Sequence, residues 1–155
     1  MYNAVIDVPF GKVGIRTDAG VVREIVYMPE SVRSVDPDNA LAKRAAKQIE
    51  RYCERASVRF DLPLAPVGTA FQQRVWNAIS EIPPGRVLTY GQLAKQIGSA
   101  PRAVGQACGA NYFPLVIPCH RVVASGGIGG FANHDEEGYF LKVKRWLLAH
   151  EGIQY

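Results

Sequence analysis

The N-terminal part of the chain alternates short apolar runs with turn residues. Runs rich in Val, Ile and Tyr cover residues 2–8, 12–17 and 21–27, separated by Pro9-Phe10-Gly11 and Asp18-Ala19-Gly20. Short β-branched runs joined by glycine-containing turns are typical of antiparallel strands. We therefore predict a three-stranded antiparallel meander in this part of the chain.

A helical pattern follows the meander. Asp36 and Pro37 are typical of a helix start, because an acid can cap the first free N–H groups and proline suits the first turn. The predicted buried stripe of this helix consists of Leu41, Ala45, Ile49, Tyr52 and Cys53. Basic residues fall on the opposite, solvent-facing side, namely Lys43, Arg44, Lys47 and Arg51.

The pattern breaks at residues 63–68, where two prolines and a glycine suit neither a helix nor a central strand. We predict an N-terminal α/β domain over residues 1–62, a linker at 63–68 and a second domain over 69–155. At 155 residues the chain can bury one sizeable core or two small ones. The predicted fold class is α+β, a small antiparallel sheet with a helix followed by a mainly helical domain.

Two capping boxes organise the second domain. Thr69 with Gln72 predicts the start of one helix, and Thr89 with Gln92 predicts the start of another. The predicted core face of the first helix consists of Phe71, Val75, Ala78, Ile79 and Ile82. After the second helix, Gly98 makes a tight turn and Ser99 is the expected cap of a further helix over residues 100–109.

Helix, short glycine-containing turn and helix form the helix-turn-helix pattern. The second helix carries small side chains and Arg102 as its one long probe. Such a helix suits shape-based contact in a narrow groove rather than reading of base edges. Close packing against a neighbouring element explains the small residues equally well. The candidate DNA-contacting residues are Thr89, Gln92, Ser99, Arg102 and Ala103.

The distribution of charge supports a nucleic-acid partner. Residues 82–134 contain no Asp or Glu, whereas Arg86, Lys95, Arg102 and Arg121 lie there and account for the net charge of +4. A surface free of carboxylates suits contact with phosphates, whose binding is chiefly electrostatic. A less charged core region would produce the same pattern.

Composition excludes several other classes of protein. The chain is 48% apolar and 21% charged, as in ordinary globular proteins, and has no signal-like start or membrane-length apolar run. We expect a cytoplasmic protein with no membrane partner. Its three cysteines show no CxxC spacing, so we expect no disulfide framework, metal site or cofactor. The run from His134 to Glu137 is interpreted as a solvated loop rather than a set of metal ligands.

One pair of residues is the candidate for chemistry. Cys119 and His120 place a thiol beside an imidazole, and a thiolate with a neighbouring base is a nucleophile. A buried structural cysteine is the alternative. The last predicted helix covers residues 139–151 and buries Phe140, Val143, Leu147 and Leu148. Glu151 lies at its C-terminal end, where the helix dipole disfavours an anion, so the residue either forms a salt bridge, is exposed, or orients His120.

The sequence from Asn111 to Val122, NYFPLVIPCHRV, resembles the active-site signature of the O6-alkylguanine-DNA alkyltransferases. Further segments from Gly68 to Gly152 are similar to landmarks of that family in the same order: GTAFQ, VW, IPPG, TYG, RAVG and WLLAHEG. The resemblance implies a ribonuclease-H-like N-terminal domain followed by a winged helix-turn-helix domain. It also implies a monomer that binds double-stranded DNA containing O6-alkylguanine, with O4-alkylthymine as a second candidate substrate.

The resemblance assigns roles to individual residues. Cys119 is implied to be the alkyl acceptor, His120 its base through a water molecule, and Glu151 the residue that orients His120. Asn111 is implied to brace the turn before the nucleophile, Tyr90 to give a proton to the departing guanine, and Arg102 to replace the extruded base. The implied pocket wall consists of Pro114, Val122, Phe131 and Ala132.

The resemblance predicts a DNA repair enzyme that flips the damaged nucleotide and transfers the alkyl group to Cys119, irreversibly and once per molecule. A thioether product has no acyl carbon for water to attack, which agrees with a single turnover. Because Cys119 is present, this prediction is favoured over a non-catalytic helix-turn-helix protein that only binds alkyl damage. From the residues alone, a helix-turn-helix regulator and a cysteine hydrolase are further alternatives. The acidic segment from Asn133 to Gly138 lengthens the family's pocket loop, which bears on the size of alkyl group accepted.

Overall fold

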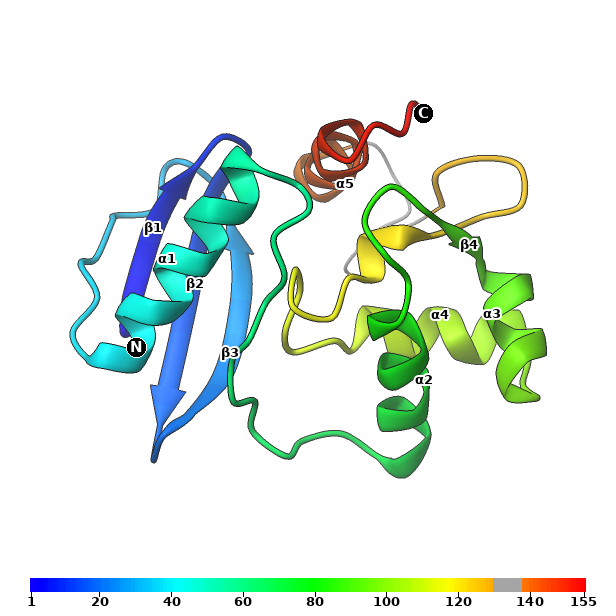
Figure 1. The fold of residues 1–155 in the computed structure, drawn as a ribbon, viewed down its shortest axis with the longest axis horizontal. Coiled ribbons are helices and arrows are strands. Elements are labelled where there is room, and N and C mark those ends of the chain that lie inside the picture. The colour runs from blue at the N-terminus through cyan, green and yellow to red at the C-terminus, as the bar shows by residue number, and fades with distance from the viewer. Residues whose placement is uncertain (130–137) are drawn as a thin grey trace. The chain divides into compact units, whose positions relative to one another are not determined.

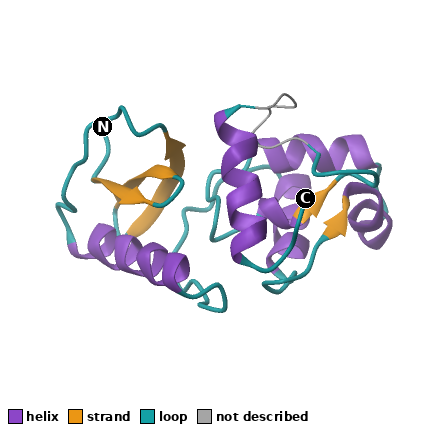
Figure 2. Ribbon diagram, turned by 90° about the horizontal axis from the view of Figure 1, so that it is seen from above, coloured by secondary structure: helices purple, strands orange, loops and turns teal. Residues whose placement is uncertain are grey.

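The computed structural model describes residues 1–129 and 138–155. The chain folds into two compact units (Figures 1 and 2). The first consists of Met1–Pro66 with Tyr112–Val116, and the second of Val67–Asn111 with Ile117–Tyr155. The return of residues 112–116 to the first unit has no counterpart in the sequence prediction. In the described residues, no helix combines the length and apolar character needed to span a membrane.

The first unit is a three-stranded sheet with one helix. Strands β1 (Ala4–Val8), β2 (Gly11–Asp18) and β3 (Val21–Met28) pair antiparallel in the order β1-β2-β3, so the predicted meander is confirmed. Helix α1 (Ala40–Glu54) covers one face of the sheet, as Figures 1 and 2 show. The backbone N–H of Ile25 in β3 donates to the carbonyl of Tyr112 at 2.9 Å, which ties the returning segment to this unit.

The predicted start of α1 at Asp36 was wrong. The helix begins at Ala40, and the side chain of Asn39 caps it by accepting a 2.8 Å hydrogen bond from the N–H of Ala42. The residues before it are extended because Val35 exchanges backbone hydrogen bonds with Val5. The later start changes the buried face, which consists of Ala42, Ala45, Ala46, Ile49 and Tyr52. Leu41 and Cys53 are therefore only half-buried.

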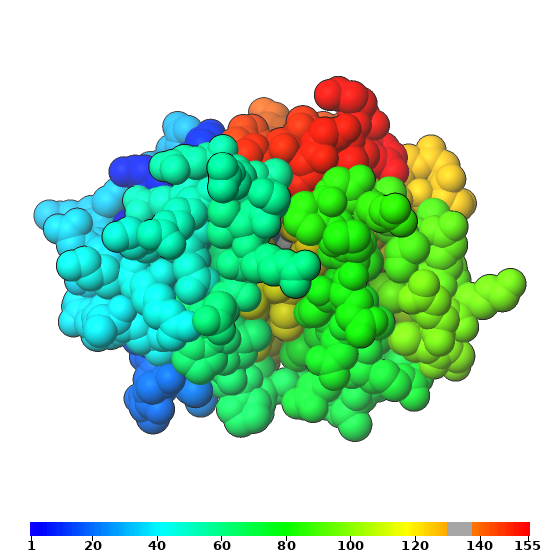
Figure 3. All heavy atoms as spheres, viewed as in Figure 1, coloured from blue at the N-terminus to red at the C-terminus, as the bar shows by residue number. Residues whose placement is uncertain are grey.

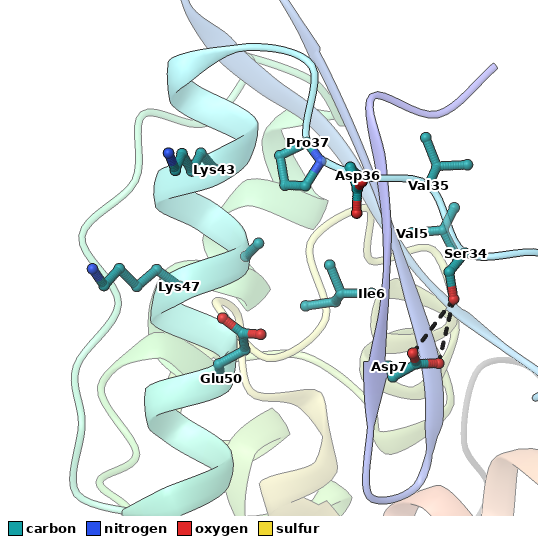
Figure 4. Close-up of a pocket in the computed structure, with 11 residues that line it drawn as sticks. Val5, Ile6, Asp7, Ser34, Val35, Asp36, Pro37, Lys43, Lys47 and Glu50 are labelled. Carbon is teal, nitrogen blue, oxygen red and sulfur yellow. Dashed lines mark hydrogen bonds between the residues drawn. The ribbon is translucent and has the colours of Figure 1, made fainter.

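A shallow pocket lies between β1, the segment of residues 34–37 and α1 (Figure 4). Ile6 points from β1 toward the helix, whereas Lys43 and Lys47 extend from α1 away from the strand. The lining also includes carboxylates, and Asp7 accepts long hydrogen bonds of 3.4 Å from Ser34. The lining therefore carries charges of both signs.

The second unit is built mainly from helices. Its elements are α2 (Ala70–Ser80), β4 (Leu88–Thr89), α3 (Tyr90–Ile97), α4 (Pro101–Gly109), the 3₁₀ turn η1 (Cys119–Arg121), β5 (Val122–Val123) and α5 (Tyr139–His150). Both capping boxes are confirmed. In each, the threonine hydroxyl accepts a hydrogen bond from the backbone N–H of the glutamine three residues later, and the glutamine side-chain oxygen accepts one from the backbone N–H of the threonine. Helix α4 packs against both α2 and α3.

Three details of the second unit differ from prediction. Ser99 does not cap α4; the N-cap residue is Ala100, which makes no side-chain bond. The physical reason is that Gly98 adopts the left-handed conformation and ends α3, and the N–H of Ser99 then bonds the carbonyl of Ala94. Phe71, Ala78 and Phe140 are half-buried, whereas Trp76 and Lys144 are buried instead. The mixed α and β composition agrees with the predicted class, while its ribonuclease-H-like and winged details stay predictions.

Candidate active site

A short parallel ladder assembles the site. Strand β4 pairs with β5 so that Leu88 lies opposite Val122 and Thr89 opposite Val123. Because the pairing is parallel, Tyr90 continues from the end of β4, whereas Cys119-His120-Arg121 precede β5 at the opposite end of the ladder. The ladder therefore holds both segments on one two-stranded frame. The pairing depends on tertiary contact, since the two strands are far apart in the sequence.

Cys119 is held in a fixed, buried turn. Pro118 has φ −81° and ψ 66°, the geometry of an inverse γ-turn, and the N–H of Cys119 accordingly donates to the carbonyl of Ile117 at 2.8 Å. The side chain of Asn111, just beyond the end of α4, donates from Nδ2 to the same carbonyl at 2.8 Å and to Cys119 Sγ at 3.2 Å. Asn111 therefore braces both the turn and the sulfur. Figure 3 shows all heavy atoms of the chain in the same view as Figure 1.

Glu151 is the centre of a buried charge network. Arg121 donates to it twice, from Nε to Oε1 at 2.9 Å and from Nη2 to Oε2 at 3.0 Å. His120 Nε2 lies 2.7 Å from Oε2, and the N–H of Gly85 donates to Oε1 at 3.2 Å. Arg121 also donates from Nη1 to the carbonyl of Ile82 at 2.7 Å. The guanidinium therefore compensates a carboxylate placed at the unfavourable C-terminal end of α5.

The contacts of His120 fix which nitrogen can act as a base. Nε2 faces the Glu151 carboxylate, so we assign the proton of the neutral ring to Nε2. Nδ1 is buried and makes no hydrogen bond with any residue in the described ranges 1–129 and 138–155. Burial lowers the pKa of His120, although the hydrogen bond to Glu151 acts in the opposite direction. The ring is thus a neutral acceptor whose free lone pair is on Nδ1.

Cys119 rests as a thiol. A hydrogen bond with Cys108 on α4, followed by burial, raises the pKa of Cys119 well above its ordinary value. The hydrogen bond from Asn111 and the charge of Lys144 oppose this increase. A nucleophilic role therefore requires a base that removes the proton of the thiol.

The comparisons with known proteins identify the family of the chain. Residues 70–153 match the profile described as 6-O-methylguanine DNA methyltransferase, DNA binding domain, which covers more than half of the chain. The chain belongs to the O6-methylguanine-DNA methyltransferase family. A methylated-DNA–protein-cysteine methyltransferase of Methanosarcina acetivorans is 37% identical over 98% of this chain and 99% of its own length.

Solved structures of O6-methylguanine methyltransferase from Mycobacterium tuberculosis are also similar. One has 33% identity, a TM-score of 0.80 and coverage of 97% of this chain and 93% of its own. Another, of the same protein in complex with DNA, has 35% identity, a TM-score of 0.76 and coverage of 95% and 90%. The methyltransferase fold therefore extends over both units and is not confined to the matched domain.

Five further predicted site residues lie at or near the starts of α3 and α4. Tyr90 is half-buried at the start of α3, and Arg102 is exposed in the first turn of α4 beside half-buried Ala103. The side chains of Thr89 and Gln92 form the capping box of α3. The structure therefore gives these two residues a structural role at the start of α3.

The predicted pocket wall is only partly placed. Val122 is fully buried in β5 of the second unit, and Pro114 is half-buried in the returning segment of the first unit. Phe131 and Ala132 lie outside the described residues, as does the run from His134 to Glu137. Among residues 1–129 and 138–155, no group of three or more His, Cys, Asp or Glu side chains gathers as a metal site would require.

Sequence reasoning missed two buried charged residues near the Cys-His segment. Arg121 was counted only as a charge, although it directly follows the Cys-His pair and holds Glu151. Lys144 was not considered, yet it is completely buried in α5, and its Nζ donates to the carbonyl of Val122 at 2.8 Å. Helical spacing offered a signal, since Lys144 lies on the same face of α5 as Leu147, Leu148 and Glu151.

Proposed function

We propose that this protein repairs DNA by taking the alkyl group from O6 of guanine onto Cys119, irreversibly and once per chain. The observation that carries the proposal is the buried cluster in which Asn111 holds the sulfur of Cys119 while Glu151 holds His120. Nucleophile, base and orienting acid are the three roles that covalent catalysis by a weak nucleophile needs. The family membership supports the same chemistry.

Activation of the thiol begins at His120. Nδ1 accepts the proton of Cys119 through a bridging water, and the imidazolium that forms is stabilised by Glu151 at 2.7 Å from Nε2. The thiolate then attacks the alkyl carbon on O6. A carbon–sulfur bond forms, the carbon–oxygen bond breaks, and its electron pair stays with the guanine. Tyr90 donates a proton to the departing base, and the proton that His120 took from the thiol passes to Tyr90 through water. The proton of the thiol thus ends on guanine, and His120 and Tyr90 are neutral again.

The substrate must leave the helix before it can react. The O6 atom lies within the base pair, where in-line attack on the alkyl carbon is blocked, so the nucleotide is flipped out. Flipping costs a few kcal/mol, and less for an alkylated base that pairs poorly. Exposed Arg102 enters the duplex and takes the place of the extruded base. The small residues of α4 allow close approach in the minor groove.

Electrostatics and family resemblance complete the proposal. The acid-free stretch around α3 and α4 faces the phosphates of double-stranded DNA, which makes binding sensitive to salt and insensitive to sequence. The protein acts as a monomer in the cytoplasm, and O4-alkylthymine is a second substrate. It needs no cofactor, because the acceptor is a residue of the chain itself.

The test uses two matched cysteine variants. Cys119→Ala should abolish transfer from a duplex that contains O6-methylguanine, yet leave its DNA affinity within about threefold of the parent, because phosphate contacts dominate binding. Cys53→Ala, in α1 of the first unit, should transfer at the parental rate. A Cys119→Ala protein that still removes methyl groups would overturn the assignment. Repeated turnover by the parent would indicate a hydrolytic enzyme instead.

A further inference from the structure

The thiol of Cys108 has no part in the mechanism proposed above. Cys108 lies near the C-terminal end of α4, where it is half-buried, whereas Cys119 in η1 is buried. The two thiols form a hydrogen bond. Cys53, the third cysteine of the chain, belongs to the other unit. Cys108 is therefore the cysteine that contacts the candidate nucleophile.

Asn111 fixes the two cysteines relative to each other. Its backbone N–H donates to the carbonyl of Cys108 at 3.2 Å, and its side chain donates from Nδ2 to Cys119 Sγ at 3.2 Å. The end of α4 that carries Cys108 is held in turn, since Trp76 Nε1 donates to the carbonyl of Ala107 at 2.8 Å. Hydrogen bonds therefore hold both cysteines in place beside each other.

A thiol at position 108 opposes activation of the resting nucleophile. Its hydrogen bond raises the pKa of Cys119 and so stabilises the protonated form, which makes Cys119 the donor and the sulfur of Cys108 the acceptor. Helix α4 uses Ala or Gly at its other small positions, and an alanine at 108 would occupy the place without this opposition. Packing alone therefore does not explain the second thiol, and its reactivity does.

We propose that Cys108 and Cys119 form a redox modification site, at which a hydroperoxide joins the two sulfurs in a reversible disulfide. The bond takes the sulfur of Cys119 out of action as a nucleophile, so alkyl transfer stops until a thiol reductant restores it. This consequence rests on the proposed function, whereas formation of the disulfide does not.

The chemistry with hydrogen peroxide is balanced. Cys108 is the more exposed thiol and meets the peroxide first, so its thiolate attacks one peroxide oxygen. A sulfur–oxygen bond forms, the oxygen–oxygen bond breaks, and the departing hydroxide takes up the proton that the thiol lost. Cys119 then attacks the sulfur of the Cys108 sulfenic acid, a sulfur–sulfur bond forms, and the hydroxyl group leaves as water with the proton of Cys119. Two thiols are oxidised to a disulfide, and the peroxide is reduced to water.

The second thiol also decides what oxidation does to the nucleophile. A Cys119 sulfenic acid without a neighbouring thiol reacts further to sulfinic and sulfonic acids, which thiol reductants do not reverse. A disulfide with Cys108 returns to the two thiols by exchange with such a reductant. Cys108 therefore preserves a nucleophile that the chain uses only once.

The experiment maps the cysteines of the full chain after treatment with hydrogen peroxide, with remaining thiols blocked by iodoacetamide. Trypsin leaves both cysteines on one peptide, residues 103–121, because no Lys or Arg lies between Arg102 and Arg121. Chymotrypsin then cleaves after Tyr112, so a disulfide joins two fragments that dithiothreitol separates. We expect these joined fragments from the parent. Burial raises the pKa of Cys53 to about 11, so Cys53 should remain a free thiol.

A matched variant tests the protective role of Cys108. Each protein is oxidised, reduced with dithiothreitol and assayed for methyl transfer from duplex DNA that contains O6-methylguanine, relative to its own activity before oxidation. The parent should recover nearly all of its activity. Cys108→Ser should recover about tenfold less, because its Cys119 is oxidised beyond the sulfenic acid. Cys53→Ser is the control and should recover like the parent.

Two results would overturn the proposal. One is an oxidised parent in which Cys119 carries no bond to Cys108, and the other is equal recovery of activity by the parent and a folded Cys108→Ser variant. Circular dichroism shows whether the variant folds, and mapping of the parent needs no variant. Since the mapping requires no DNA, failure of the reduced parent to accept alkyl groups would refute the proposed function and leave the disulfide standing.

Discussion

Replacing Glu151 by Gln should separate two roles of this residue, namely compensating the charge of Arg121 and orienting His120. The side chain of Glu151 is fully buried, and it accepts two hydrogen bonds from Arg121 besides its contacts with His120 and Gly85. Glutamine has nearly the same shape but no charge, so the guanidinium would remain buried without a counterion. Breaking a buried pair in this way costs about 3–5 kcal/mol of unfolding free energy. The loss should appear in urea unfolding followed by circular dichroism.

A second substitution should recover the stability but not the activity. Adding Arg121→Met removes the uncompensated charge. The loss of unfolding free energy in the double variant should therefore be about 1–3 kcal/mol smaller than the sum of the losses in the two single variants. Its methyl-transfer rate should stay far below that of the parent, because the His120 imidazolium still lacks a carboxylate. Glu24→Gln is the control: its pair with Arg16 at 3.2 Å is partly exposed and should contribute less than about 1 kcal/mol.

The assay measures single-turnover methyl transfer at a temperature where every variant is folded. The expected result is a loss of about 100-fold or more in both Glu151 variants, in the range that general acid–base catalysis contributes. If Glu151→Gln destabilises the protein but transfers methyl groups at the parental rate, the carboxylate only neutralises Arg121. The proposed part of Glu151 in activating His120 would then be refuted.

Further predictions concern DNA binding, pH and helix capping. Arg102→Ala should slow repair of duplex DNA about tenfold or more but leave reaction with a free O6-alkylguanine base unchanged, and equal losses on both would show that Arg102 serves the pocket or the fold. Because the pKa of Lys144 is lowered to about 8, the folded state binds fewer protons than the unfolded state between pH 8 and about pH 10.5. The parent should therefore gain up to about 3 kcal/mol of unfolding free energy over Lys144→Met across that range in urea unfolding, and a constant difference would contradict the shift. Thr69→Ala should cost about 1 kcal/mol in the same assay, since it removes half of the capping box of α2, and an unchanged stability would contradict that role.

Local signals in the sequence predicted the local structure. Thr69 and Gln72 are three residues apart, and the capping box that they form depends on no distant contact. The strands of the first unit were predictable for the same reason, because tight turns connect them in sequence. The start of α1 was predicted wrongly because Val35 pairs with Val5 on a distant strand, which keeps residues near Asp36 extended. Asn39 then provides the cap instead.

The site was predictable only where a resemblance or an anomaly drew attention to a residue. Glu151 was selected because an anion at a helix end needs an explanation, and the structure places it against His120 and Arg121. Arg121 and Lys144 were missed because their hydrogen bonds connect elements that are far apart in the sequence. Arg121 in η1 bonds Glu151 at the end of α5, and Lys144 in α5 bonds Val122 in β5. Local sequence patterns do not predict such contacts. Lys144 lies on an otherwise apolar face of its helix, and a charged residue in that position indicates a buried charge. A search for apolar residues at helical spacing does not detect it.

Mass spectrometry can show whether Cys119 accepts one alkyl group from DNA. The parent protein is incubated with an excess of duplex oligonucleotide that carries a single O6-methylguanine, and intact protein and peptides are then weighed. We expect a gain of one methyl group per chain, located on Cys119, together with unmodified guanine in the DNA. A methyl group on Cys53 or Cys108, or continued removal of methyl groups by protein whose mass stays unchanged, would contradict it.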